Sequence, residues 1–281
     1  ELVTSFWHQA SPEQKLLTLT RGMTVGADFP LEGARQYGKE LVDLHHPLGD
    51  LDLQRCRWIG QTANRILTGV AQELEPGVTE EEVAARLLHE YALAGMTIDV
   101  LIVGFDDRIK RYRHPMPSGN NLQRYALLHP AARRWGLHAN VTRLVQFGEP
   151  PSDIQRAIDG TATIGGHVAT MLAPDLPFAD LLAEQIRLYR VLGYSGEWMY
   201  HFQGGITGYT LADAARCRDP EARVVERQAY DYFITITGAK FEEFTLLTAD
   251  GPEIASLGPG WPVRSIQTPK GDIDVPDVLI R

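Results

Sequence analysis

Histidine is the first residue type in this chain that points to chemistry. His114 directly precedes Pro115, and a residue before proline is restricted to an extended backbone. A histidine titrates near neutral pH and can transfer a proton to or from a bound molecule. We therefore expect His114 to be a general acid or base. The plainer alternative is a histidine that only hydrogen-bonds a sheet edge.

A second group of polar residues lies in a glycine-rich segment. Residues 197–209 read EWMYHFQGGITGY and include His201, Gln203 and Tyr209. Glycines let the backbone approach a ligand closely, and aromatic rings can wall a pocket. The segment could therefore line a substrate site, and the plainer alternative is an ordinary glycine-rich loop.

Two adjacent carboxylates complete the candidates. Glu242 and Glu243 lie on a predicted strand, where neighbouring side chains point to opposite faces, so one of them can face a cavity. Glu242 beside His114 would form a minimal acid–base pair, and the carboxylate would raise the pKa of the histidine.

The elements that position these residues follow from hydrophobic periodicity and helix caps. Thr79 and Glu82 form a capping-box pattern that predicts the start of a helix. We expect helices over residues 56–74, 79–95, 152–172 and 179–192, and strands over 98–105, 125–132, 137–147, 229–237 and 244–248. Two helices followed by strands thus occur twice, which predicts two α/β halves facing each other over one sheet.

The N-terminal region differs from the rest of the chain. Residues 1–50 contain one short helical pattern, over 31–44, and are interrupted by glycine and proline. We expect residues 1–50 to be the remnant of a preceding module plus a linker. Residues 51–262 are expected to be the main domain and 263–281 a C-terminal tail.

The charge and cysteine content argue against several classes of protein. The chain has 27 basic and 36 acidic residues, a net charge of −9, which argues against a nucleic-acid-binding surface. No apolar run approaches the about 18 residues of a membrane span. Two widely separated cysteines and no signal-peptide pattern predict a cytoplasmic location.

Four blocks of the sequence resemble the pita-bread superfamily of creatinase, aminopeptidase P, prolidase and methionine aminopeptidase. The blocks are residues 76–80, 113–148, 197–209 and 237–245, and they are most similar to a branch of Xaa-Pro peptidases. The resemblance implies an α+β pita-bread fold, with two pseudo-related α/β halves around a curved antiparallel sheet. It also implies a homodimer.

The resemblance places the metal ligands as well. Members of the superfamily hold two divalent ions with two aspartates, one histidine and two glutamates. At those positions this chain has His129, Asn140, Gly205, Phe233 and Glu242. One carboxylate cannot neutralise two cations, so we expect no metal and no other cofactor. A single metal held by His129, His201 and Glu242 is the alternative.

Creatinase is a member of the superfamily that works without metal, and it implies roles for several residues. By that resemblance His114 would move the proton and Glu242 would hold the substrate, while Asn140 replaces a second carboxylate. A neutral or anionic substrate is therefore expected, with Arg143 as an anion contact. The expected substrate-binding residues are His129, Asn140, Arg143, His201, Gln203 and Tyr209.

Together these inferences imply a metal-independent hydrolase, or a related lyase, acting on a C–N bond of a small polar amide- or amidine-type molecule or a short peptide. Two alternatives stay open. One is an inactive pita-bread domain that only binds a small molecule or a peptide. The other is an Xaa-Pro-type metallopeptidase with an altered metal site. Convergence of His114, His201 and Glu242 within hydrogen-bond reach in a closed pocket would favour the hydrolase, and scattered or solvent-facing side chains would favour the binding domain.

Overall fold

The computed structural model of this chain describes residues 4, 6, 8–9 and 11–281. The chain divides into two compact units between His46 and Pro47, close to the expected boundary. The first unit contains α1 (Pro12–Leu19), β1 (Gly26–Ala27), β2 (Arg35–Gln36) and α2 (Gly38–Asp43). The helix expected over 31–44 is confined to α2, because Gly33 has a φ of +75° and β2 follows it.

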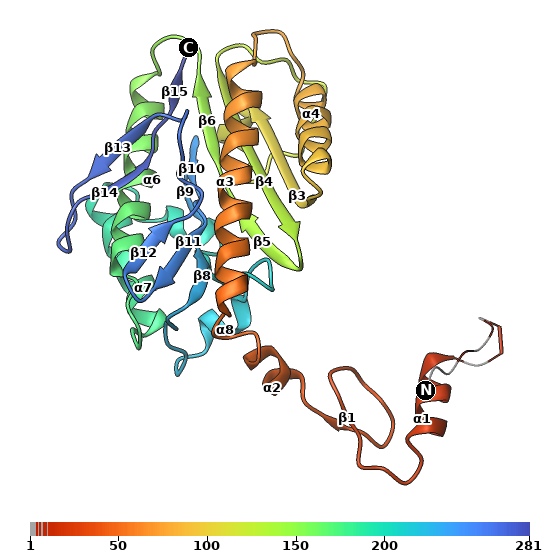
Figure 1. Cartoon of the computed structure of the whole chain (residues 1–281). Helices are drawn as coiled ribbons and strands as arrows, with labels where there is room; N and C mark the ends of the chain where they lie inside the picture. Colours follow the sequence, from red (N-terminus) through yellow and green to blue (C-terminus); the bar gives the residue numbers. More distant parts are fainter. Residues whose placement is uncertain (1–3, 5, 7, 10) are drawn as a thin grey trace. The chain divides into compact units, whose positions relative to one another are not determined.

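The second unit contains two pairs of long helices (Figure 1). The first pair is α3 (Asp50–Gln72) and α4 (Glu80–Leu93), and the second is α6 (Ser152–Met171) and α7 (Phe178–Val191). The capping box predicted for α4 is present. Thr79 Oγ1 accepts a hydrogen bond from the Glu82 amide at 3.2 Å, and the Glu82 carboxylate accepts one from the Thr79 amide at 2.8 Å. The short helices are α5 (Asp107–Arg111), η1 (Glu197–Tyr200) and α8 (Ala214–Arg218).

Each helix pair packs against its own set of strands. The first sheet, which contacts α3 and α4, has the order β15-β6-β4-β3, with β5 also paired to β4. Its strands are β3 (Thr97–Phe105), β4 (Tyr125–Arg134), β5 (Leu137–Asn140), β6 (Arg143–Gln146) and β15 (Leu279–Ile280). All pairings in this sheet are antiparallel except β15 with β6.

The second sheet is antiparallel and has the order β12-β11-β8-β7. Its strands are β7 (Gly205–Thr207), β8 (Gln228–Asp231), β11 (Thr245–Thr248) and β12 (Gly251–Ile254). Two hairpins accompany it, β9 (Ile234–Ile236) with β10 (Ala239–Phe241), and β13 (Val263–Ile266) with β14 (Ile273–Pro276). Helix α6 lies against β9, β10 and the β13–β14 hairpin.

Strand β4 shows how the two halves share the first sheet. Ala126 and Leu128 belong to the core under α3 and α4, whereas Tyr125 and Leu127 belong to the core under α6 and α7. Side chains alternate along a strand, so a strand that is buried on both faces supplies both cores. The strand turns into β5 through a tight hairpin, in which Trp135 and Gly136 both have positive φ.

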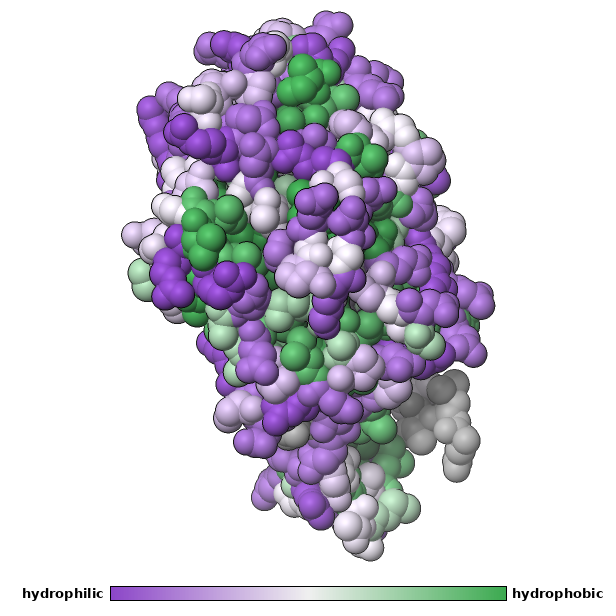
Figure 2. All heavy atoms as spheres, turned by 90° about the vertical axis from the view of Figure 1, so that its left-hand side faces the viewer, coloured by the Kyte–Doolittle hydropathy of each residue, from purple (hydrophilic) through white to green (hydrophobic). Residues whose placement is uncertain are grey.

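Residues 263–281, which we expected to be a tail, are part of the second unit instead. They form the β13–β14 hairpin and then β15, which extends the first sheet by pairing parallel to β6. The indole of Trp261 donates a hydrogen bond to the carbonyl of Asp277 at 2.8 Å. This bond holds the segment between β14 and β15 in place. On the face that carries this hairpin, hydrophobic residues form separate small groups among hydrophilic ones, as on ordinary solvent-facing surfaces (Figure 2).

No helix within the described ranges is both long and apolar enough to cross a bilayer.

Candidate functional site

A cavity of about 530 Å³ brings together residues from both halves of the second unit. Its polar lining consists of His114, His129, Asn140, His201, Lys240 and Glu242. Its apolar lining includes Val100, Ile102, Ala131, Phe202 and Phe233. His114 and Tyr200 are exposed, whereas His129 and Glu242 are buried, so the cavity opens to solvent beside His114. Pockets of this size with a few polar groups on apolar walls are typical of small-molecule sites.

The first sheet sets the position of the inner polar residues. In the β3–β4 ladder His129 pairs with Ile102, and in the β4–β5 hairpin Asn140 pairs with Ala131. Directly paired residues project to the same face of a sheet, so these four side chains face the cavity together. The Nδ1 atom of His129 lies 3.0 Å from Oγ1 of Thr142 and 3.7 Å from Oε2 of Glu242.

His114 and His201 form a pair whose protons can be assigned. Nδ1 of His201 lies 2.5 Å from the carbonyl oxygen of Phe202, and a carbonyl only accepts, so this nitrogen carries the proton. In a neutral ring Nε2 of His201 is then an acceptor. It lies 2.8 Å from Nε2 of His114, which must therefore donate. The remaining nitrogen of His114, Nδ1, keeps a lone pair that can accept a proton.

The electrostatic environment keeps the histidines of the cavity neutral. Burial and the Lys240 ammonium lower the pKa of His201 to about 3 and lower that of His129 well below its usual range. The same two causes lower the pKa of His114. We expected Glu242 to pair with His114 and raise this pKa, and that was wrong. The partner of His114 is His201, and burial and the Lys240 ammonium lower its pKa.

Lys240 is a cavity residue that the sequence analysis did not select. Its Nζ lies 2.6 Å from Oε2 of Glu242, and both side chains are 3% exposed. The ammonium also lies 5.6 Å from the centre of the Phe233 ring. Lys240 precedes Glu242 by two positions on a predicted strand, so side-chain alternation alone places both on one face. That signal was available from the sequence.

Asp231 is a second missed residue, buried beside this ion pair. Burial raises the pKa of Asp231 far above its usual range, and the neighbouring Glu242 raises it further, while Lys240 opposes both. Burial likewise raises the pKa of Glu242 against the effect of Lys240. Neither carboxyl oxygen of Asp231 has a hydrogen-bond partner among the described residues. Asp231 and Glu242 together thus carry less negative charge than two ionised carboxylates would.

These residues do not fit the dinuclear metal site of the superfamily. Within the part of the chain that the structure describes, no three histidine, cysteine or carboxylate side chains lie close enough to hold a metal ion. His129, His201 and Glu242, the alternative set for a single metal, therefore do not form a metal site either. Glu242 is already neutralised by Lys240, which supplies an internal cation instead. Two divalent ions need several anionic donors, which this cavity lacks.

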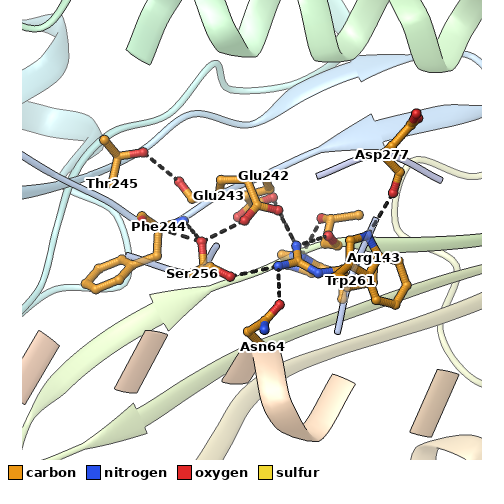
Figure 3. Close-up of polar contacts among 11 residues, drawn as sticks. Asn64, Arg143, Glu242, Glu243, Phe244, Thr245, Ser256, Trp261 and Asp277 are labelled. Atoms are coloured by element: carbon orange, nitrogen blue, oxygen red, sulfur yellow. Dashed lines mark hydrogen bonds and ion pairs between the residues drawn. The ribbon is translucent and has the colours of Figure 1, made fainter. Parts of the chain in front are cut away.

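Arg143, which we expected to contact an anionic substrate, lies in a different cluster (Figure 3). Its side chain is fully buried and forms an ion pair with Glu243. Nη2 also donates to Asn64 Oδ1 at 3.0 Å and to the Ser256 carbonyl at 2.8 Å. Ser256 Oγ in turn donates to Glu243 Oε2 at 2.6 Å. Arg143 therefore ties helix α3 to the second sheet rather than facing the cavity.

Gln203 and Tyr209 do not line this cavity. Gln203 is buried, and its Nε2 donates to the carbonyls of Trp198 and His201 at 3.0 and 2.9 Å. The hydroxyl of Tyr209 donates to Asp52 Oδ1 at 2.9 Å, which holds the tyrosine against α3. The structure thus brings together His114, His129, Asn140, His201 and Glu242.

Comparison with known proteins agrees with this architecture. The chain is 19% identical over 251 residues to an uncharacterized peptidase of Staphylococcus aureus strain MW2, covering 86% of this chain and 71% of that protein. It superposes on a dipeptidase PepE from Mycobacterium ulcerans with a TM-score of 0.76 at 16% identity, covering 96% of this chain and 75% of that one. It superposes on an Xaa-Pro dipeptidase from Bacillus anthracis with a TM-score of 0.75 at 16% identity, covering 98% and 80%.

These likenesses establish the shared pita-bread fold. The model of Metallopeptidase family M24 matches residues 54–230, from α3 to β8, which is more than half of the chain and includes His114, His129, Asn140 and His201. The chain therefore belongs to Metallopeptidase family M24.

Proposed function

We propose that this chain is a metal-independent hydrolase, or a related lyase, that cleaves a C–N bond of a small polar amide- or amidine-type molecule or a short peptide. The observation that carries the proposal is that His114, Lys240 and Glu242 line one cavity. A proton acceptor, a fixed cation and a carboxylate are the groups that acyl transfer to water needs.

His114 acts as the general base in this proposal. Its unprotonated Nδ1 takes a proton from water as the water oxygen bonds to the carbonyl or amidine carbon. The same proton then passes to the departing nitrogen as the C–N bond breaks. His201 acts as a positioning residue, because its Nε2 accepts from His114 and fixes the tautomer. General acid–base catalysis of this kind contributes about 10²–10⁴-fold.

Lys240 supplies the positive charge that stabilises the oxygen or nitrogen carrying negative charge in the transition state. An ammonium has three N–H donors, and Glu242 occupies part of this capacity while holding Lys240 in place. A preorganised cation in a cavity with apolar walls stabilises developing charge more than water does. Glu242 can also accept a hydrogen bond from a substrate N–H.

The main alternative is a domain that binds a ligand without catalysis. It predicts scattered candidates, whereas here His114 and His201 lie within hydrogen-bond distance of each other and line the same cavity as Glu242. This convergence supports the hydrolase. An altered metallopeptidase has less support, because the donors around Glu242 do not fit a metal site.

The test is a substrate screen with matched variants. Purified protein in the presence of a chelator is incubated with amides, ureas, guanidino compounds and Xaa-Pro dipeptides, and release of amine or ammonia is measured. His114→Ala should reduce turnover by at least about a hundredfold. His89→Gln, a change at an exposed histidine of α4, should leave it unaltered.

Two results would contradict the proposal. One is unchanged turnover in His114→Ala. The other is stoichiometric manganese, cobalt, zinc or iron in protein purified without chelator, together with activity lost on metal removal.

A further inference from the structure

A cluster of three polar side chains joins segments on either side of the cavity mouth. Nη2 of Arg113 forms an ion pair with Oε2 of Glu197 and lies 3.3 Å from Oγ1 of Thr237. Glu197 accepts two further hydrogen bonds, from the amide of Thr237 at 3.1 Å and from its hydroxyl at 2.9 Å. The side chains of Arg113 and Glu197 are 21% and 19% exposed. An ion pair that is partly shielded from water and has several hydrogen bonds holds its geometry better than a fully exposed one.

Each member of this cluster stands close in sequence to a polar residue of the cavity. Arg113 directly precedes His114, the general base of the proposed reaction. Glu197 begins η1, and His201 directly follows this helix. The third member lies in the turn between β9 and β10, and the cavity lysine follows on β10. The cluster therefore joins the three segments that carry the base, its histidine partner and the cation.

The chain around His114 is attached to a different element on each side. After His114, Pro115 packs so closely on Gly104 of β3 that a Cβ atom there would lie 2.3 Å from Cγ of the proline. Before His114, Arg113 is bound to Glu197 of η1. The residue that follows the base is thus attached to the first sheet, and the residue that precedes it is attached to the segment of its partner. The orientation of the His114 ring depends on both attachments.

We propose that Glu197 is a second positioning residue of the site, which holds the ring of His114 against His201 through its contacts with Arg113 and the β9–β10 turn. In this arrangement Nε2 of His114 donates to Nε2 of His201 over 2.8 Å, and Nδ1 stays free to take a proton. The positioning is a property of the folded chain. Only its effect on turnover rests on the proposed hydrolase.

Two substitutions at one position separate the contacts of Glu197 from its charge. Glu197→Ala removes the charge and every acceptor, whereas Glu197→Gln removes the charge but keeps an oxygen that can accept from Arg113 or Thr237. Loss of the charge alone would lower the pKa of His114 in both variants, because a carboxylate favours a protonated histidine. Loss of the contacts should raise this pKa towards 6.5 in Glu197→Ala only, because a released ring is less buried and lies farther from Lys240.

Both effects are measured by NMR on the whole chain with isotope-labelled histidines. A scalar coupling between the two Nε2 atoms reports the hydrogen bond from His114 to His201, and a pH titration gives the pKa of His114. Glu197→Ala should lose the coupling and raise the pKa, while Glu197→Gln should keep the coupling. A coupling that persists in Glu197→Ala, or a pKa that falls equally in both variants, would overturn the proposal.

Glu253→Ala is the matched control for the loss of an ion pair. Glu253 of β12 binds Arg57 of α3, and neither residue lines the cavity. This variant should lower the unfolding temperature but leave the coupling and the pKa of His114 unchanged. If Glu197→Ala behaved in the same way as this control, Glu197 would have a structural role only.

Turnover of a substrate found in the screen tests the catalytic consequence separately. Arg113 and Glu197 do not line the cavity, so Glu197→Ala should lower kcat about ten- to hundredfold with little change in KM, as expected when a catalytic group is misplaced. Glu197→Gln should retain most of the activity. A lost coupling with unchanged kcat would support the positioning and contradict the role of His114 as the base. An intact coupling in Glu197→Ala would overturn the positioning, whatever the turnover.

Discussion

The Nζ atom of Lys240 lies 2.6 Å from Oε2 of Glu242, and this buried ion pair borders the cavity. The adjacent Glu243 forms an ion pair with Arg143 on the opposite face. Glu242 and Glu243 thus form ion pairs with two different cations on opposite faces, as side-chain alternation along a strand predicts. One pair borders the cavity, and the other stabilises the junction of α3 with the second sheet.

Replacing Lys240 by methionine should destabilise the protein in a pH-dependent way. The change leaves Glu242 buried without a cation, which costs about 3–5 kcal/mol for a broken buried pair. Burial already raises the pKa of Glu242, and loss of the ammonium raises it further. A group whose pKa is raised on folding loses its stabilising contribution as pH rises, so the loss should be larger at pH 8 than at pH 5. Urea unfolding at both pH values measures it.

The double variant Lys240→Met/Glu242→Gln should recover much of the loss and remove its pH dependence. Lys110→Met, at an exposed ion pair with Asp153, is the control and should change stability little. NMR titration gives a second measurement, because Lys240 lowers the pKa of His114 and His201. Both pKa values should rise in Lys240→Met, and unchanged values would mean that the ammonium does not act on the histidine pair.

We expect the protein to lose stability in acid because His201 is buried in its neutral form. Its pKa is lowered from 6.5 to about 3 on folding, so the unfolded chain binds the proton more readily between these values. Stability from this group is complete above pH 6.5 and is lost as pH falls towards 3. His201→Phe should therefore flatten the pH dependence of the unfolding free energy by up to about 1.4 kcal/mol per pH unit.

Urea unfolding between pH 4.5 and 7.5 compares His201→Phe with the original chain, so titration of the buried carboxyls largely cancels in the difference. His89→Gln, at an exposed histidine, should follow the original curve. A parallel curve for His201→Phe would show that His201 is not buried in its neutral form.

The buried pair of Arg143 and Glu243 should be among the most sensitive positions for stability. Arg143→Met leaves the Glu243 carboxylate buried beside Ser256 and should cost about 3–5 kcal/mol. Arg143→Met/Glu243→Gln should cost less than Arg143→Met alone, because the uncompensated charge is gone. Chemical unfolding of the three proteins gives the coupling free energy. If instead Arg143→Met stayed fully folded but lost ligand binding, the substrate role that we first expected would be restored.

The sequence predicted those elements whose signals are local. Periodic apolar residues and the Thr79 capping box predicted α3 and α4, and two extended runs separated only by residues 133–136 predicted β4 and β5. Residues 263–281 were misassigned, because their strands are short and gain stability only by pairing with β14 and β6. Long-range pairing leaves little trace in local periodicity.

The site was predicted in part for a similar reason. His114, His129, Asn140, His201 and Glu242 stand in blocks with a recognisable order, and they line one cavity. The partners of Arg143 come from positions 64, 243 and 256, so its burial could not be inferred from its own neighbours. Lys240 could have been found from alternation with Glu242. The homodimer and the cytoplasmic location stay predictions.

The resemblance to the superfamily implies that Gly205 occupies the position of a ligand histidine, and its geometry predicts that one substitution cannot place a histidine ligand there. Its φ is +149°, and an added Cβ would lie 2.1 Å from Sγ of Cys217. Gly205→Ala should therefore destabilise the protein by about 2–4 kcal/mol, from backbone strain and overpacking. Gly205→His should be worse, and zinc should not rescue it.

Two further variants, compared by thermal unfolding, show why substitution of Gly205 destabilises the protein. Gly205→Ala/Cys217→Ala should recover part of the loss, because the contact with Sγ is removed while the backbone strain stays. Gly69→Ala, in the last turn of α3 with no atom within 4 Å of the added Cβ, should stabilise the protein by up to about 0.5–1 kcal/mol. If Gly205→His unfolded at the original temperature and bound one zinc ion per chain, steric exclusion at this position would be refuted, and metal loss would have to arise from the other four positions alone.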